Sequence, residues 1–222
     1  MTAGNRAFED CFTIGYCGFS PETYCMNQFE YVMVLISIIV GLGVAHLLLG
    51  ISGIIDRLMR GKEPMELSLA HAAWLGCVFG WLVMFWWWEY RFSTRVADWT
   101  LGLYFFLVLY AVVLFLLSAI LVPRTWDGVD SLKDYFLRRR AWFYGLYMSA
   151  SAIDLVDSYL KGGLDYFRDS VGMAPLSFTL LSFPIGMIGI KTCNMTFHNW
   201  FGVFFMIGQY SLGFGLLYTL RI

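Results

Sequence analysis

Long apolar runs alternate with short charged segments along most of this chain. The first run, Tyr31–Ile55 (YVMVLISIIVGLGVAHLLLGISGII), contains no charged residue. A core helix of a soluble protein has no reason to be apolar on all sides over such a length, whereas a helix that crosses a bilayer needs roughly 20 apolar residues. The pattern predicts six membrane helices, at approximately residues 30–55, 67–89, 99–122, 140–160, 172–190 and 196–220.

The predicted fold is therefore all-α: a polytopic membrane helix bundle over residues 30–220, preceded by an extracytoplasmic tail over residues 1–29. Short loops make consecutive helices antiparallel neighbours. Basic residues favour cytoplasmic loops, and their distribution places both termini outside. The inner loops then contain Arg57, Arg60, Lys62, Arg124, Lys133, Arg138, Arg139, Arg140 and Lys191, and the outer segments contain Arg6, Arg91, Arg95, Lys161, Arg168 and Arg221.

Two local signals refine this arrangement of helices. In the longest loop, the segment DSLKDYFLRRR has a helical pattern that extends the fourth helix into the cytoplasm, with Asp130 or Ser131 as its N-cap. Pro184 lies well inside the fifth predicted helix. Because proline removes a backbone donor and clashes with the preceding turn, this position predicts a kink.

Composition excludes several classes of protein. Only 14% of the residues are charged, whereas soluble domains contain about a quarter. The net charge of −1 gives no indication of a basic surface, so no nucleic-acid partner is expected. No GxSxG, Walker or GxGxxG motif is present, and an enzyme is not expected. The tail contains Cys11, Cys17 and Cys25. Two alternatives remain open: a disulfide between two of these cysteines, or three unpaired thiols.

The fourth predicted helix carries the most informative polar pattern. Its polar residues recur at alternating steps of three and four, which places them on one helix face. Asp154 lies roughly 9 Å inside the outer end of this helix at 1.5 Å per residue. A carboxylate at that depth is costly unless it is paired or hydrated. The face consists of Tyr144, Tyr147, Ser151, Asp154, Ser158 and Lys161.

This face predicts a cation or proton pathway that uses Asp154 and Asp157. The alternative is structural, with the two acids tied to Lys161, Arg91 or Arg95 at the outer surface. For Asp154 we favour the pathway, and for the shallower Asp157 we favour the structural interpretation. Ser151 on the same face and Gln209 on the sixth helix complete the polar set, together with His46 and Glu89.

Glu89 follows three tryptophans, and we place it at the outer boundary of the membrane. With Glu30 it would form an acidic vestibule beside Asp157. An ordinary interfacial charge is the favoured interpretation, because an acid costs little at that depth.

The three histidines form a second constellation. In the predicted topology His46, His71 and His198 all fall in the inner half of the membrane or at its midplane. Imidazoles at such positions are candidate haem or metal ligands. The favoured alternative is three separate histidines, each bonded to a neighbouring helix or to the lipid headgroups. Stripes of small residues flank two of them and allow close helix packing. These stripes are Gly43, Gly50 and Gly53 beside His46, and Gly202 and Gly213 beside His198.

Three stretches, FEYVMVLISIIVGLGVAHLLLG, FWWWEYRF and DYFLRRRAWFYG, resemble a group of small bacterial inner-membrane proteins that have no assigned function. The landmarks of this resemblance are His46, the run Trp86–Trp88 and the segment RRRAWF. It implies a bacterial cytoplasmic membrane and carries over no catalytic or binding residue. The cysteine-bearing tail is not part of the pattern.

Three functional hypotheses follow. The first is a small channel or transporter protomer, homo-oligomeric, with an ion or proton pathway lined by the polar face of the fourth helix. The second is a non-catalytic membrane subunit that binds a partner protein. The third is a membrane haem or metal protein that uses the histidines. We rank the hypotheses in this order, because ionisable groups inside a membrane more often mark pathways than cofactor sites. No cofactor is expected under the first hypothesis.

Overall fold

The computed structural model describes residues 28–60, 65–96, 99–126, 128–168 and 172–219, and this part of the chain is helical, with no strand. Two short helices, α3 (Phe92–Arg95) and α6 (Gly163–Tyr166), lie at one end of the bundle. We call this the α3/α6 end. The long helices are α1 (Gln28–Arg60), α2 (Leu69–Glu89), α4 (Leu101–Leu121), α5 (Leu132–Leu160), α7 (Met173–Lys191) and α8 (Met195–Thr219).

Four helices of the described residues are long and apolar enough to cross a membrane: α1, α2 extended through α3, α4 and α7. The structure therefore agrees with an integral membrane protein. Six spans are not confirmed, because α5 and α8 are not among the four. Polar side chains interrupt both, including Asp154 and Asp157 on α5 and Gln209 on α8.

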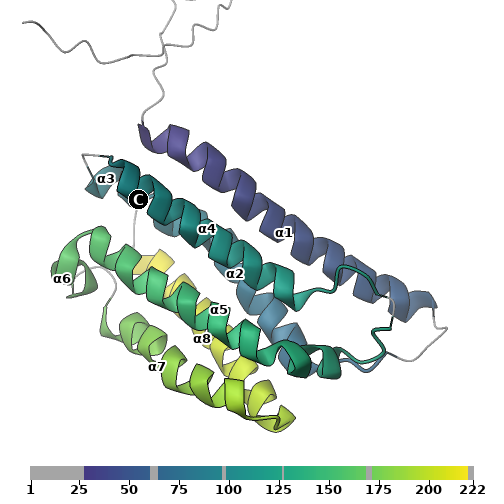
Figure 1. Ribbon diagram of the computed structural model, residues 1–222. Helices are drawn as coiled ribbons and strands as arrows, with labels where there is room; N and C mark the ends of the chain where they lie inside the picture. Colours follow the sequence, from purple (N-terminus) through teal and green to yellow (C-terminus); the bar gives the residue numbers. More distant parts are fainter. Residues whose placement is uncertain (1–27, 61–64, 97–98, 127, 169–171, 220–222) are drawn as a thin grey trace, which may run out of the picture.

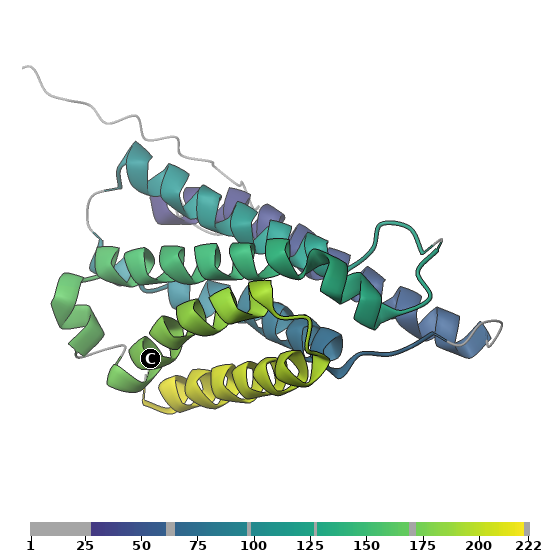
Figure 2. The ribbon, with the colours of Figure 1, turned by 60° about the horizontal axis from the view of Figure 1, so that its bottom comes forward.

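Consecutive long helices run antiparallel (Figure 1). Helix α1 packs against α4, α2 packs against both α4 and α8, and α5 lies between α4 and α7. Figure 2 shows α7 and α8 together on the side of the bundle away from α1. The first residue of α1 and the last of α8 both lie at the α3/α6 end. The predicted antiparallel order of neighbouring helices is thus what the structure shows.

Side-chain caps set several helix starts. The Oγ of Ser131 accepts a hydrogen bond from the backbone N–H of Asp134 (3.3 Å) at the start of α5. Of the two predicted caps, Ser131 is therefore the one used, and the predicted extension of this helix is confirmed. Thr100 caps α4 in the same way. Such a cap satisfies a backbone donor that has no partner within the helix. Helix α7 continues through Pro184 to Lys191.

The core is aromatic and centres on Trp74 of α2, which is fully buried. Rings from α5 and α8 surround it at centroid distances of 4.9–6.1 Å. Edge-to-face and offset contacts of this kind are favourable beyond the area they bury. The surrounding rings are those of Phe143, Tyr144, Tyr147, Phe201 and Phe205.

Small residues let these helices approach closely, as the predicted stripes require. A Cβ added at Gly202 of α8 would lie 3.2 Å from the Cβ of Ala73 on α2. At Gly43 of α1 it would lie 3.3 Å from Leu82 of α2. Both stripes therefore face a neighbouring helix, which is the packing role of small residues in membrane bundles.

Candidate functional site

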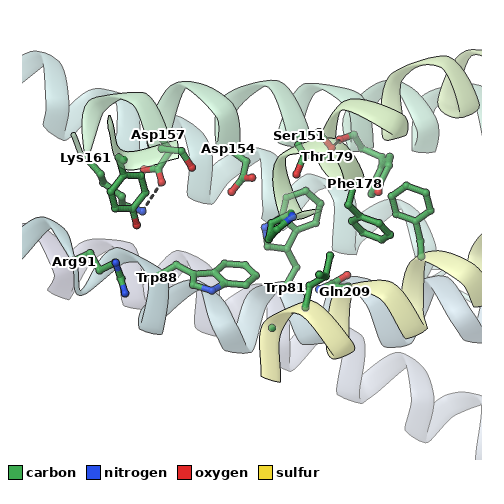
Figure 3. Close-up of a pocket in the computed structure, with 17 residues that line it drawn as sticks. Trp81, Trp88, Arg91, Ser151, Asp154, Asp157, Lys161, Phe178, Thr179 and Gln209 are labelled. Atoms are coloured by element: carbon green, nitrogen blue, oxygen red, sulfur yellow. Dashed lines mark hydrogen bonds and ion pairs between the residues drawn. The ribbon is translucent and has the colours of Figure 1, made fainter. Parts of the chain in front are cut away.

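A cavity of about 160 Å³ lies between α2, α5, α7 and α8 near the α3/α6 end. This volume has room for several water molecules or one small organic molecule. Its polar lining residues are Arg91, Ser151, Asp154, Asp157, Ser158, Lys161, Thr179 and Gln209, and its aromatic lining residues are Trp81, Trp88, Tyr147, Tyr166, Phe178 and Phe205. Figure 3 shows the α5 residues on one wall, opposite Trp81 and Trp88 of α2.

The cavity collects most of the polar face predicted on α5. Five of the six residues of that face line it, from Tyr147 to Lys161. The sixth, Tyr144, lies one turn deeper, where its hydroxyl is hydrogen-bonded to Nδ1 of His198 (2.8 Å). Steps of three and four keep side chains on the same side of a helix, and tertiary packing has turned that side inward.

Asp154 is held by a hydrogen-bond chain from two other helices. Its Oδ1 accepts from the hydroxyl of Tyr110 on α4 (3.1 Å), and that hydroxyl accepts from Nε1 of Trp81 on α2 (3.2 Å). Tyr110 is almost fully buried, so its orientation is fixed. Among the described residues, no hydrogen-bond donor contacts Oδ2 of Asp154. One oxygen is thus positioned by the protein, and the other is available to a molecule in the cavity.

Asp157, Lys161 and Glu89 form a buried ionic triad. Nζ of Lys161 lies 3.2 Å from Oε1 of Glu89 and forms a second ion pair with Oδ2 of Asp157. The three residues are 1–4% exposed. Oε2 of Glu89 and Oδ1 of Asp157 are buried without a hydrogen-bond partner among the described residues. Because two carboxylates share one ammonium, the triad retains one negative charge when all three groups are ionised.

The triad changes the predicted roles of its two acids. Asp157 is tied to Lys161, as its structural interpretation proposes, but the pair is buried and not at the outer surface. Glu89 is buried within the protein, and it is not among the residues that line the cavity. It is buried because the C-terminal ends of α2 and α5 meet, and there it forms an ion pair with Lys161.

Ser151 and Gln209 line the cavity while bonding to backbone carbonyls. The Oγ of Ser151 donates to the carbonyl of Tyr147 one turn earlier (3.0 Å). Nε2 of Gln209 donates to the carbonyl of Cys77 on α2 (3.1 Å). The structure therefore brings Ser151, Asp154, Asp157 and Gln209 together in one place, although Gln209 is far away in the sequence.

The three histidines do not converge. Nε2 of His71 is hydrogen-bonded to the carbonyl of Leu121 (2.7 Å), and His198 bonds both Tyr144 and the carbonyl of Thr192. His46 does not line the cavity, and its buried Nε2 has no partner among the described residues. No group of three or more metal-ligating side chains occurs in the described part of the chain. The predicted three-histidine site is not assembled, because the three rings lie on α1, α2 and α8 in separate packing environments.

Two important residues, Tyr110 and Trp81, were not singled out from the sequence, and they orient Asp154. Arg91, one of the predicted partners of the two acids, lines the cavity beside Tyr166, whose ring centroid lies 5.9 Å from the guanidinium carbon. Tyr110 did offer a signal, since its hydroxyl is one of few polar groups in the apolar run Leu101–Leu121. Nothing local distinguishes Trp81 from the other tryptophans. The three tail cysteines lie outside the described residues.

No protein-family model matches this chain, and no curated protein or solved structure is significantly similar to it. The case for a function therefore rests on the residues and geometry of the cavity.

Proposed function

We propose that the protein is a small transporter protomer of a bacterial cytoplasmic membrane, which moves a cation or protons along the polar face of α5. In this proposal all six long helices cross the bilayer and both termini lie outside. Asp154 is the central binding residue, supported by Ser151 and Gln209.

The outward surfaces of α5 and α8 support six spans. Helix α5 turns Ser151 and Asp154 toward the cavity, α8 turns Gln209 toward it, and both helices expose large apolar side chains. Trp142 and Val156 of α5 are 74% and 48% exposed, and Phe204 and Ile207 of α8 are 50% and 58% exposed. A helix with polar groups turned inward and apolar groups turned outward fits lipid even when its mean hydropathy is modest.

The arrangement of connections supports the orientation. The C-terminal ends of α1, α4 and α7, after which the α1–α2, α4–α5 and α7–α8 connections begin, lie at the end opposite to α3 and α6. Most basic residues of the chain belong to these connections and the adjoining helix ends, including Arg57, Arg124 and the run Arg138–Arg140. Basic residues concentrate on the cytoplasmic side of membrane proteins. The α3/α6 end and the cavity would then face outward.

The observation that carries the proposal is the position of Asp154. Its Oδ1 is fixed by Tyr110, and its Oδ2 has no protein partner among the described residues. A carboxylate inside a membrane bundle is costly unless a cation or water compensates it. Asp154 lies on the wall of a cavity between four helices, which has room for a cation or water molecules that compensate its charge.

The closed inner side of the cavity favours a transporter over an open channel. Tyr147 is the lining residue of α5 farthest from the α3/α6 end, 13 residues before Leu160, or roughly 20 Å at 1.5 Å per residue. Its ring packs on that of Trp74 at 5.0 Å. Beyond it, the aromatic core fills the space toward the opposite end. Passage through the bundle therefore requires these rings to move, as alternating access would.

The test is uptake into liposomes that contain only this protein. Wild-type vesicles loaded with a pH-sensitive dye, or with a dye that senses the added monovalent cation, are expected to show flux of protons or of that cation above empty vesicles. Asp154→Asn is expected to reduce that flux at least tenfold. The matched control is Asp134→Asn, an exposed acid at the other end of the same helix, which is expected to leave the flux unchanged. Absence of flux above empty vesicles, or unchanged flux in Asp154→Asn, would overturn the proposal.

A further inference from the structure

The residues that line the cavity favour one chemical class of cation. We propose that its ligand is a small organic ammonium ion, quaternary or protonated amine, whose charged nitrogen lies between Asp154 and the aromatic rings. This inference rests on the proposed function, because it names the substrate class of the same site.

Aromatic rings from four helices surround the cavity. Trp81 and Trp88 come from α2, and Tyr147, Phe178 and Phe205 from α5, α7 and α8. The face of an aromatic ring attracts a cation, most strongly for tryptophan and in a desolvated site, and aromatic cages are the common way to bind quaternary ammonium groups. Figure 3 shows Trp81 and Trp88 across the cavity from Asp154, so a cation between them would contact rings and carboxylate together.

Asp154 is the carboxylate of the cavity wall that has no cationic partner among the described residues. The other charged lining residues are Asp157, Lys161 and Arg91. Lys161 is already paired with both acids of the triad. Arg91 lies against the ring of Tyr166. Asp154 forms no ion pair with the described residues, and a monovalent ammonium ion beside it would supply the cationic partner that it lacks.

An inorganic ion fits the lining less well. Hard cations need six or more oxygen ligands that converge on one point. The hydroxyl of Ser151 and the amide nitrogen of Gln209 donate to backbone carbonyls, which fixes the direction of their oxygens, and one Asp157 oxygen is already paired with Lys161. Aromatic carbon makes up much of the remaining wall. A quaternary ammonium ion is weakly hydrated, and it needs only one carboxylate and the faces of aromatic rings; a protonated amine would in addition donate its N–H groups to Asp154.

The size of the cavity limits the ligand. An apolar cavity of about 150 Å³ holds a benzene molecule, and the cavity here measures about 160 Å³. The fitting ligand therefore has about six to eight non-hydrogen atoms. Choline has this size, and its uncharged carbon isostere, 3,3-dimethylbutan-1-ol, has the same shape.

Calorimetric titration of the full chain in mild detergent tests the inference, with choline and its isostere as probes. Choline is expected to bind, and the isostere to bind roughly 30-fold more weakly, since a desolvated cation–π contact is worth about that factor. Asp154→Asn is expected to weaken choline binding at least tenfold, and Trp88→Leu about two- to fivefold. Asp134→Asn and Trp142→Leu, at exposed positions of α5, are the matched controls and should bind choline as wild type does.

Equal binding of choline and its isostere would overturn the inference without any variant, so the test does not depend on the folding of a mutant. Displacement of choline by sodium or potassium at equal concentration would also overturn it, in favour of an inorganic ion. The two proposals fail differently. Ion flux without choline binding would overturn only the proposal that the substrate is an organic ammonium ion. Choline binding without flux of choline or protons would overturn only the proposal that the protein is a transporter.

Discussion

Lys161 is the residue whose loss the structure predicts to be most damaging to stability. It is the single cation of the buried triad, with Nζ in contact with Asp157 and 3.2 Å from Glu89. Lys161→Gln keeps the approximate length of the side chain and removes its charge. Two carboxylates would then remain side by side, with no cation between them, in a region where all three residues are at most 4% exposed.

The expected cost follows from this burial. Removing one partner of a buried ion pair costs about 3–5 kcal/mol, because the remaining charge is desolvated and unpaired. For a chain of 222 residues, each kcal/mol shifts the melting temperature by about 2–4 °C. We therefore expect Lys161→Gln to lower the apparent melting temperature by about 6–20 °C.

Intrinsic tryptophan fluorescence during heating in mild detergent measures this shift. Lys133→Gln is the matched control: its Nζ lies 3.6 Å from Glu66, but the two side chains are 42% and 56% exposed, so a loss of at most about 1 kcal/mol is expected. Adding Glu89→Gln to Lys161→Gln removes one stranded carboxylate and should recover part of the lost stability. If Lys161→Gln melts within about 2 °C of wild type, the triad is not the stabilising element described above.

Two further predictions concern packing and hydrogen bonding. Gly189→Ala would place a Cβ 2.6 Å from the ring of Tyr144 and force α7 away from α5, whereas the Cβ of Gly145→Ala meets nothing within 4 Å. Thermal melting should show that Gly189→Ala is destabilised and that Gly145→Ala is stabilised by about 0.5–1 kcal/mol. Equal melting temperatures of the two variants would contradict the close approach of α7 to α5. Tyr110→Phe removes the acceptor of the Trp81 N–H, so the same assay should show a loss of about 1–3 kcal/mol, and no loss would mean that this hydrogen bond is not formed.

The helices themselves were predictable from local sequence. Their apolar composition and caps act over a few residues, as at Ser131, whose hydroxyl caps the start of α5. The same holds for the polar face of α5, because positions three and four apart share one side of any helix. That Ser151, Asp154 and Lys161 lie on one side of α5 follows from this rule alone, whereas tertiary packing makes that side a wall of the cavity.

The partners of that face depended on the tertiary structure. Glu89 and Lys161 are 72 residues apart in sequence, and Tyr110 and Asp154 are 44 apart. Gln209 joins the cavity because α8 packs on α2, while His46 is left outside it on α1. Apolarity and helical period are properties of a single segment in its solvent, so the sequence determines them directly. Which helix faces meet is decided by van der Waals fit and close approach at small residues between distant segments, and one sequence carries no local record of that choice.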